Sequence, residues 1–190
     1  MRLMILSTVL LLLTACSQED TKVDTNALAS ESRQTVKEFF GQLKGELQAA
    51  MQSGGPVKAI EVCQIKAPVI AGDISKKKGW RVARTSLKTR NSANKADAWE
   101  QQVLQRFEEQ KQQGKDPKQM EHYELVDADG VKTFRYMKAI PTGGICIACH
   151  GAELAPDIAQ KIKQLYPDDQ ATGYVPGDIR GAFTISQTIR

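Results

Sequence analysis

The first strong pattern in the chain is an apolar stripe at helical spacing near its N-terminal end. It predicts an amphipathic helix over roughly Ala27–Gln52. Gly54-Gly55 is expected to end this helix, and Pro56 suits the first turn of a second helix that carries Cys63. Pro68 is expected to break or kink the second helix. The stripe consists of Val36, Phe39, Phe40, Leu43, Leu47, Ala50 and Met51.

After Gly79, which should close this helical region, the pattern changes to a period of two. The segment "WRVARTSL" predicts a strand with Trp80, Val82 and Arg84 on one side. The segment "HYELVDADGVKTFRYMKAI" predicts a hairpin, because two β-rich runs are joined around Asp129-Gly130. "GAFTIS", near the C-terminal end, predicts a last strand.

Two further helices are indicated by their start signals. Asp97 and Glu100 form a capping-box pattern, so a helix should begin near Ala98. Pro156 opens a shorter helix that Pro167 stops. Helices therefore come early and antiparallel strands late, which predicts an α+β fold rather than a doubly wound sheet.

The N-terminal residues have the features of an export signal. Met1–Ala15 contains Arg2 and then an apolar run, which is too short to span a bilayer because a spanning helix needs roughly 20 apolar residues. The run ends in small residues directly before Cys16, and "LTAC" resembles the lipobox of bacterial lipoproteins. A plain signal peptide that leaves Cys16 free is the alternative.

Lipid chains on Cys16 would anchor the protein to the periplasmic face of a membrane without spanning it. The outer membrane is favoured, because Ser17 follows the cysteine and no aspartate argues for inner-membrane retention. Residues 16–31 are polar and predict a tether, and residues 32–190 are long enough for a single domain.

Composition excludes several classes of partner and gives no sign of an enzyme. The 26 lysines and arginines are interspersed with 22 acidic residues, so no basic stripe predicts nucleic-acid binding. The sequence shows no pair of nucleophile and base, no phosphate-binding loop and no second metal-binding cluster. We therefore expect a non-enzymatic protein whose redox or signalling partner the sequence does not identify.

The strongest chemical motif is Cys146-Ile147-Ala148-Cys149-His150 within "GGICIACHGAEL". This C-x-x-C-H spacing is typical of c-type haem attachment. Two thiols three positions apart can form thioethers with the two vinyl groups of one haem, and His150 then lies under the iron as the proximal ligand. Gly143, Gly144 and Gly151 are expected to let the backbone lie close to the ring. One motif predicts one covalent haem c.

Two other interpretations use the same side chains. Cys146 and Cys149 could form a redox disulfide, although the βαβ setting of thioredoxin-like proteins is missing. Cys63, Cys146, Cys149 and His150 could also bind zinc as a Cys₃His set, although adjacent residues rarely ligate one tetrahedral ion. The alternative function is therefore an exported binding module stabilised by zinc or by a disulfide.

Cys63 is left over once the other cysteines have a covalent role. It could be a small buried apolar residue, since free cysteine is often buried, or it could be the distal haem ligand. Spacing alone does not choose between Cys63 and the remaining candidate ligands. Those candidates are His122, Met51, Met120 and Met137.

Five segments in order resemble a family of exported single-haem c-type cytochromes. They are "PVKAIEVCQIKAPVIA", "WRVARTSLKTRNSANKADAWE", the hairpin, "GGICIACHG" and "PGDIRGAFTIS". The resemblance covers about Val36–Ser186 and implies a fold similar to PAS sensor domains. It also implies that His150 and Cys63 are the two axial ligands of the iron. One departure is visible: Ser92 and Ala96 stand where the family's loop is expected to have prolines.

A thiolate ligand would give the iron a low reduction potential, because it stabilises ferric over ferrous iron. Electron transfer and haem-based sensing of redox state or a small ligand are both compatible with such a site. Arg84 and Arg90 are candidates for contact with a haem propionate, and an ordinary salt bridge is the alternative for each.

Overall fold

The structure is a computed structural model that describes residues 23–128 and 130–189. The predicted signal peptide and Cys16 lie outside the described residues. None of the helices within those ranges is long and apolar enough to cross a membrane. The helices and strands are α1 (Thr25–Lys78), β1 (Arg81–Thr85), η1 (Ser92–Asn94), α2 (Ala98–Gln112), η2 (Pro117–Gln119), β2 (Glu121–Ala128), β3 (Val131–Pro141), α3 (Gly144–His150), α4 (Pro156–Leu165) and β4 (Ile179–Thr188).

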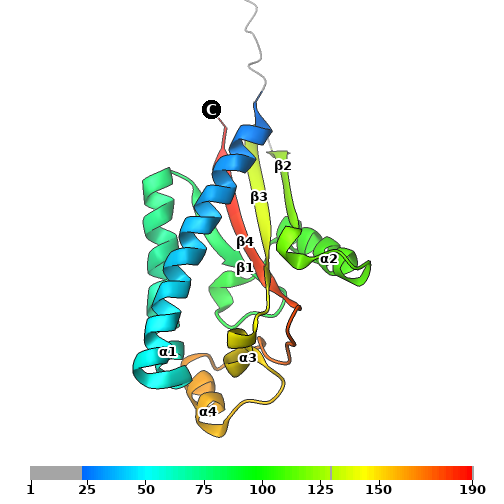
Figure 1. The fold of residues 1–190 in the computed structure, drawn as a ribbon. Helices are drawn as coiled ribbons and strands as arrows, with labels where there is room; N and C mark the ends of the chain where they lie inside the picture. Colours follow the sequence, from blue (N-terminus) through cyan, green and yellow to red (C-terminus); the bar gives the residue numbers. More distant parts are fainter. Residues whose placement is uncertain (1–22, 129, 190) are drawn as a thin grey trace, which may run out of the picture.

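Helix α1 consists of two halves that fold back on each other (Figure 1). Asp24 caps its start by accepting hydrogen bonds from the backbone N–H groups of Asn26 and Ala27, so the helix begins within the segment expected as a tether. The halves meet at Gly54 and Gly55, as predicted. Gly55 has a φ of 68°, a left-handed conformation that glycine adopts without strain.

The predicted break of the second half at Pro68 does not occur. The helix continues through Pro68 to Lys78 and ends at Gly79, whose φ of 69° is a left-handed cap. Proline removes one backbone N–H from the helix, a cost of about 3 kcal/mol. Burial of Ala67, Ile70 and neighbouring apolar side chains offsets this cost.

The four strands form one antiparallel sheet in the order β1-β4-β3-β2. The predicted hairpin is confirmed, since Ala128 pairs with Val131 at its tip. The last strand is also confirmed, although β4 is longer at both ends than "GAFTIS". Together with the flanking helices, this sheet confirms the predicted α+β fold.

The sheet buries both of its faces. Phe39 of α1 packs at 5.2 Å, ring centroid to ring centroid, against Phe183 of β4. On the other face, Phe107 of α2 belongs to a cluster with Met137 and Ala182. Figure 1 shows α1 and α2 on opposite sides of the strands, with α3 and α4 together at one end. The core facing α1 contains Val36, Phe39, Ile70, Ile74, Val82, Phe134, Tyr136, Phe183 and Ile185.

Helix α2 begins with the predicted capping box. The Glu100 backbone N–H donates to Asp97 Oδ1 at 2.8 Å, and the Asp97 N–H donates to Glu100 Oε2 at 3.1 Å. Glu100 is only 1% exposed, yet Thr184, Arg81 and Arg135 all donate to its Oε1. This carboxylate is therefore buried with a full set of partners on the α2 face of the sheet.

Candidate functional site

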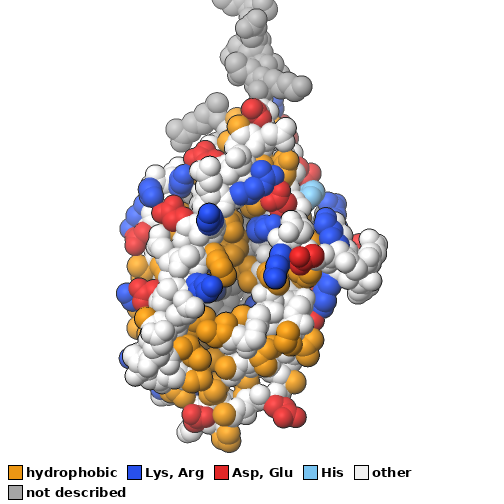
Figure 2. All heavy atoms as spheres, in the orientation of Figure 1, with side chains coloured by type: hydrophobic (Ala, Val, Ile, Leu, Met, Phe, Trp, Pro, Cys, Tyr) orange, Lys and Arg blue, Asp and Glu red, His pale blue; other side chains and the backbone are white. Residues whose placement is uncertain are grey.

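A cavity of about 380 Å³ lies on the α1 face of the sheet, toward α3. Its size is in the range of pockets that hold small molecules and cofactors. Figure 2 shows apolar side chains gathered over the end of the molecule where Figure 1 places α3 and α4. Both halves of α1 contribute apolar lining: Phe39, Leu43, Leu47 and Met51 from the first, and Ala59, Ile60, Ala67, Pro68 and Ala71 from the second.

The C-x-x-C-H motif forms α3, and its Cys146, Cys149 and His150 all line this cavity. Residues three positions apart on a helix share a face, so the two thiols point into the same space. Burial raises the pKa of the Cys149 thiol, with Arg90 acting in the opposite direction. The sequence pattern therefore forms one site in the folded protein.

Gly151 is required by a contact within the protein, and its expected approach to a haem ring stays a prediction. A Cβ at Gly151 would lie 2.7 Å from the carbonyl oxygen of Ile147, so the close approach is to the helix itself. A Cβ at Gly144 would meet nothing within 4 Å. Gly151 is thus required where the chain leaves α3.

His150 is held by a backbone carbonyl. Its Nδ1 lies 2.7 Å from the Ala171 oxygen, so Nδ1–H donates to that oxygen. The neutral tautomer that makes this bond leaves the lone pair of Nε2 available for a metal. Burial, together with the nearby Arg180 and Arg90, lowers the pKa of His150 to about 2. The ring is therefore neutral and oriented by its neighbours.

Cys63 lies on the second half of α1 and lines the same cavity as the motif. Burial raises the pKa of its thiol, and Arg84 and Arg90 lower it. Of the other candidate ligands, Met51 also lines the cavity. Met120 and Met137 are completely buried in the core on the α2 face, and His122 contacts Glu124 and Trp99. The structure thus leaves Cys63 and Met51 at the site.

Arg84 lies where its strand pattern predicts. It pairs with Phe183, so its side chain is on the α1 face, and it lines the cavity. Its guanidinium carbon lies 6.0 Å from the Phe39 ring centroid, and burial lowers its pKa while Cys63 and Tyr166 raise it. Among the described residues, no carboxylate forms an ion pair with Arg84. It is a cation directed into a cavity without an anionic protein partner.

Arg90, the second arginine predicted to contact a propionate, already has protein partners. It forms a paired hydrogen bond with Asp169, from Nε at 3.1 Å and from Nη2 at 3.0 Å. Its Nη2 also donates to the carbonyl oxygen of Cys149 at 2.6 Å. Arg90 lines the cavity, but these bonds show that it ties the motif to the loop after α4. A propionate contact for Arg90 stays a prediction.

Sequence reasoning missed Arg180, which also lines the cavity. Its Nε lies 3.3 Å from His150 Nδ1, and its Nη1 donates to Ser86 Oγ and the Lys88 carbonyl oxygen, both at 3.2 Å. The only sequence signal was its position directly before the predicted last strand. No described aspartate or glutamate lines the cavity. The charged side chains that line it are three arginines: Arg84, Arg90 and Arg180.

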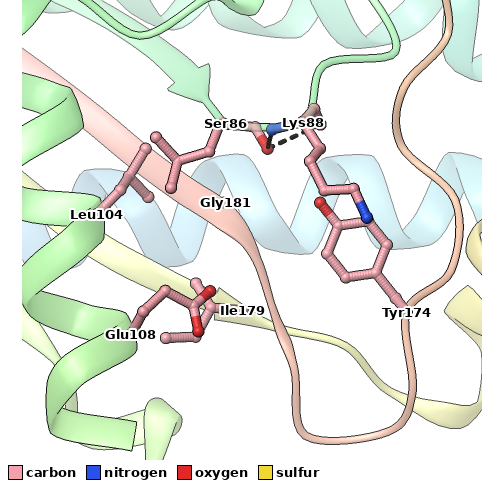
Figure 3. Close-up of a pocket in the computed structure, with 8 residues that line it drawn as sticks. Ser86, Lys88, Leu104, Glu108, Tyr174, Ile179 and Gly181 are labelled. Carbon is pink, nitrogen blue, oxygen red and sulfur yellow. Dashed lines mark hydrogen bonds between the residues drawn. The ribbon is translucent and has the colours of Figure 1, made fainter.

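A second, smaller cavity of about 90 Å³ shares Ser86 and Gly181 with the larger one (Figure 3). The Lys88 amine lies 4.9 Å from the Tyr174 ring centroid, and Figure 3 shows it over that ring. A Cβ at Gly181 would lie 2.3 Å from the Thr85 carbonyl oxygen. Gly181 is therefore required where β1 and β4 separate the two cavities.

The geometry gives no support to the two alternative uses of the cysteines. Cys63, Cys146 and Cys149 are all free thiols. Within residues 23–128 and 130–189, no group of three or more His, Cys, Asp or Glu side chains is arranged to hold a metal ion directly.

Comparison with known proteins places the chain in a family. The family model described as Tll0287-like matches residues 15–188. The chain belongs to the Tll0287-like family. Its match includes the motif, Cys63 and all three cavity arginines. Among solved structures, the crystal structure of the cyanobacterial haem protein Tll0287 is similar, with a TM-score of 0.62 and 22% identity over 87% of this chain and 94% of that chain. No curated protein sequence matches.

Proposed function

We propose that this member of the Tll0287-like family is a c-type cytochrome with one covalent haem and a low reduction potential. The observation that carries the proposal is the cavity, which brings Cys146, Cys149 and His150 together with Cys63 and unpaired arginine charge. The haem protein of similar fold supports the same cofactor. The cavity's apolar walls and excess positive charge fit a flat apolar ring that carries two carboxylates.

Each cysteine of the motif has a defined chemical role in this proposal. Cys146 and Cys149 would hold the haem covalently, because each S–H group could add across one vinyl double bond and form a thioether without an oxidant or a leaving group. His150 would hold the iron through Nε2, with its Nδ1–H still donating to the Ala171 carbonyl oxygen. When bound, the iron supplies reversible one-electron chemistry.

Cys63 is proposed as the distal ligand, as a thiolate. A bound metal deprotonates a coordinating thiol, which overcomes the effect of burial on the Cys63 pKa. Thiolate donation stabilises the oxidised iron, so the potential should be lower than with a histidine and methionine pair. With both axial positions filled by the protein, we propose a redox protein rather than an enzyme.

Electron transfer is the role that this arrangement supports best. We further propose that a lipid anchor on Cys16 holds the protein at the periplasmic face of a membrane, and we favour the outer membrane. Sensing of redox state or of a small ligand is a second candidate. The specific observation in its favour is that Met51 lines the cavity together with Cys63. Exchange of a thiolate for a thioether on reduction would be a ligand switch, and the proposed likeness to PAS sensor domains agrees with it.

The deciding experiment is spectroscopy of protein matured with a cytochrome c assembly system. We expect a c-type pyridine haemochrome with one haem per chain, and a low-spin ferric electron paramagnetic resonance signal of thiolate type. Cys63→Ser should remove the thiolate signal and keep the covalent haem, while Met51→Leu should keep both in the ferric state. Absence of covalent haem would refute the proposal, and an unchanged signal in Cys63→Ser would refute the distal ligand.

A further inference from the structure

Strand β4 contains an irregularity that exposes one particular side chain to the cavity. Against β3, Gly181 pairs with Ile140 and Ile179 pairs with Pro141, so Arg180 has no partner in the register. Arg180 is therefore the extra residue of a β-bulge, and bulges re-aim side chains. Ile179 and Ala182 accordingly both pack in the core on the α2 face, while Arg180 lines the cavity on the α1 face.

The surroundings of Arg180 hold the guanidinium in place from several elements. Ser86 Oγ and the Lys88 carbonyl oxygen, from the segment after β1, accept from its Nη1. Its Cζ lies 5.4 Å from the ring centroid of Tyr174, and the amine of Lys88 lies over the same ring (Figure 3). These contacts orient the cation, but none of them neutralises it.

The contact with His150 does not satisfy Arg180 either. Nδ1 of His150 lies 2.7 Å from the Ala171 carbonyl oxygen and 3.3 Å from Nε of Arg180. An Nδ1–H that donates to the carbonyl cannot also accept from a guanidinium N–H. The shorter contact is the hydrogen bond, so Nε of Arg180 retains an unused donor beside the ring.

No described carboxylate forms an ion pair with Arg180. Burial lowers the pKa of Arg180, and the nearby carboxylate of Asp169 acts in the opposite direction, but this carboxylate already forms a salt bridge with Arg90. Arginine is suited to planar, bidentate recognition of a carboxylate, and a buried unpaired cation is costly. The bulge therefore places an oriented, uncompensated guanidinium on the His150 side of the cavity, as β1 places Arg84 on the Cys63 side.

We infer that Arg180 is a cofactor-binding residue that pairs with one carboxylate of the haem on the His150 side of the site, with Arg84 available to the other. This inference rests on the proposed function. Two guanidinium groups without protein carboxylates match the two carboxylates of one haem. Pairing with Arg180 keeps its carboxylate ionised, and the cation beside the proximal ligand favours the reduced iron.

The test is the reduction potential of the matured protein as a function of pH, for the natural chain and for Arg180→Gln. In the natural chain, the paired carboxylate stays ionised across roughly pH 5–9, so it adds no pH dependence. Without Arg180, burial raises the pKa of the carboxylate into this range. Since ionisation of the carboxylate favours ferric iron, the potential of Arg180→Gln should fall as the pH rises, and at high pH it should lie below that of the natural chain.

Two further variants separate charge pairing from a structural role. Arg180→Lys keeps the cation and should keep the flat profile. Arg106→Gln removes an exposed arginine of α2 and should leave the potential unchanged. The inference is overturned if Arg180→Gln retains the natural profile, or if the Gln and Lys variants shift the potential equally at every pH. Covalent haem is assayed first in the natural chain. If it is absent there, the proposed function is refuted, and this outcome is distinct from the two results for the Arg180 variants that overturn the inference.

Discussion

The two faces of the sheet both carry charged side chains that are shielded from water, Glu100 fully and Arg84 and Arg180 in part, but they compensate these charges differently. On the α2 face, Glu100 is 1% exposed and accepts from Thr184 at 2.8 Å and from Arg81 at 3.3 Å. On the α1 face, Arg84 and Arg180 border a cavity that no described carboxylate lines. A buried charge is stable when it is paired and hydrogen-bonded. The charge of Glu100 is therefore compensated within the protein, whereas Arg84 and Arg180 have no described carboxylate as an ion-pair partner.

This difference separates a structural network from a binding site without reference to the cysteine motif. Charge and shielding from water alone do not separate the two cases, because Glu100 is buried and Arg84 is half-buried. The two cases differ in whether the charged side chain has an oppositely charged or hydrogen-bonding partner within the protein. Removing a charge should therefore have opposite consequences on the two faces, and three variants test this.

The largest effect is expected for Glu100→Ala on the α2 face. The change leaves Arg135, whose side chain is 15% exposed, with a weaker set of partners and removes the acceptor of buried Thr184. The free energy of unfolding should fall by about 3 kcal/mol or more, measured by denaturant titration. Glu109→Ala, an exposed change in the same helix, should alter it by no more than about 0.5 kcal/mol. Equal effects of the two variants would contradict the comparison.

A smaller effect, of opposite sign, is expected for Arg84→Gln on the α1 face. In protein expressed without haem, and shown by circular dichroism to be helical, loss of an unpaired cation should raise the free energy of unfolding by about 1 kcal/mol. In the haem-containing protein, the same variant should lower the free energy of unfolding. Arg81→Gln, on the same strand but bonded to Glu100, should lower it in both forms. A decrease for Arg84→Gln in the haem-free form would show that the cation has a protein partner.

The smallest effect concerns the pH dependence contributed by Asp97. Burial raises the pKa of this carboxyl, but hydrogen bonds from Arg135 and the Glu100 N–H outweigh it and hold the pKa below the ordinary value of 3.8. Asp97 therefore stabilises the fold above pH 3.8, and this contribution is lost as the pH falls toward the lower folded pKa. Unfolding measured from pH 6 down to about pH 2 should show a shallower loss of stability in Asp97→Asn. An identical slope in both proteins would exclude this contribution.

Local sequence signals predicted much of the fold. The capping box at Asp97 and Glu100, the hairpin and the position of Arg84 beside Val82 are each fixed by residues close together in the chain. The C-x-x-C-H spacing likewise brings its own three side chains together on one helix. Cys63 could be named as a candidate because few other ligands exist, but only the fold places it in the same cavity.

The errors and omissions arise where distant segments meet. Pro68 was predicted to break or kink α1, but packing of that half against the sheet outweighs a local helix-breaking tendency. Arg90 finds Asp169, which is 79 residues away, so its salt bridge has no local signature. Arg180 was overlooked because a period-two pattern cannot locate an extra residue in a strand.

The bulge in β4 also bears on how this site can change in evolution. Without Arg180, Ile179 would directly precede Gly181, and the strand would alternate regularly between its two faces. A deletion of one codon would then remove the cation and preserve the packing of Ile179 and Phe183. Relatives that differ by one residue at this point should share the fold and differ in the charge beside the histidine of the motif.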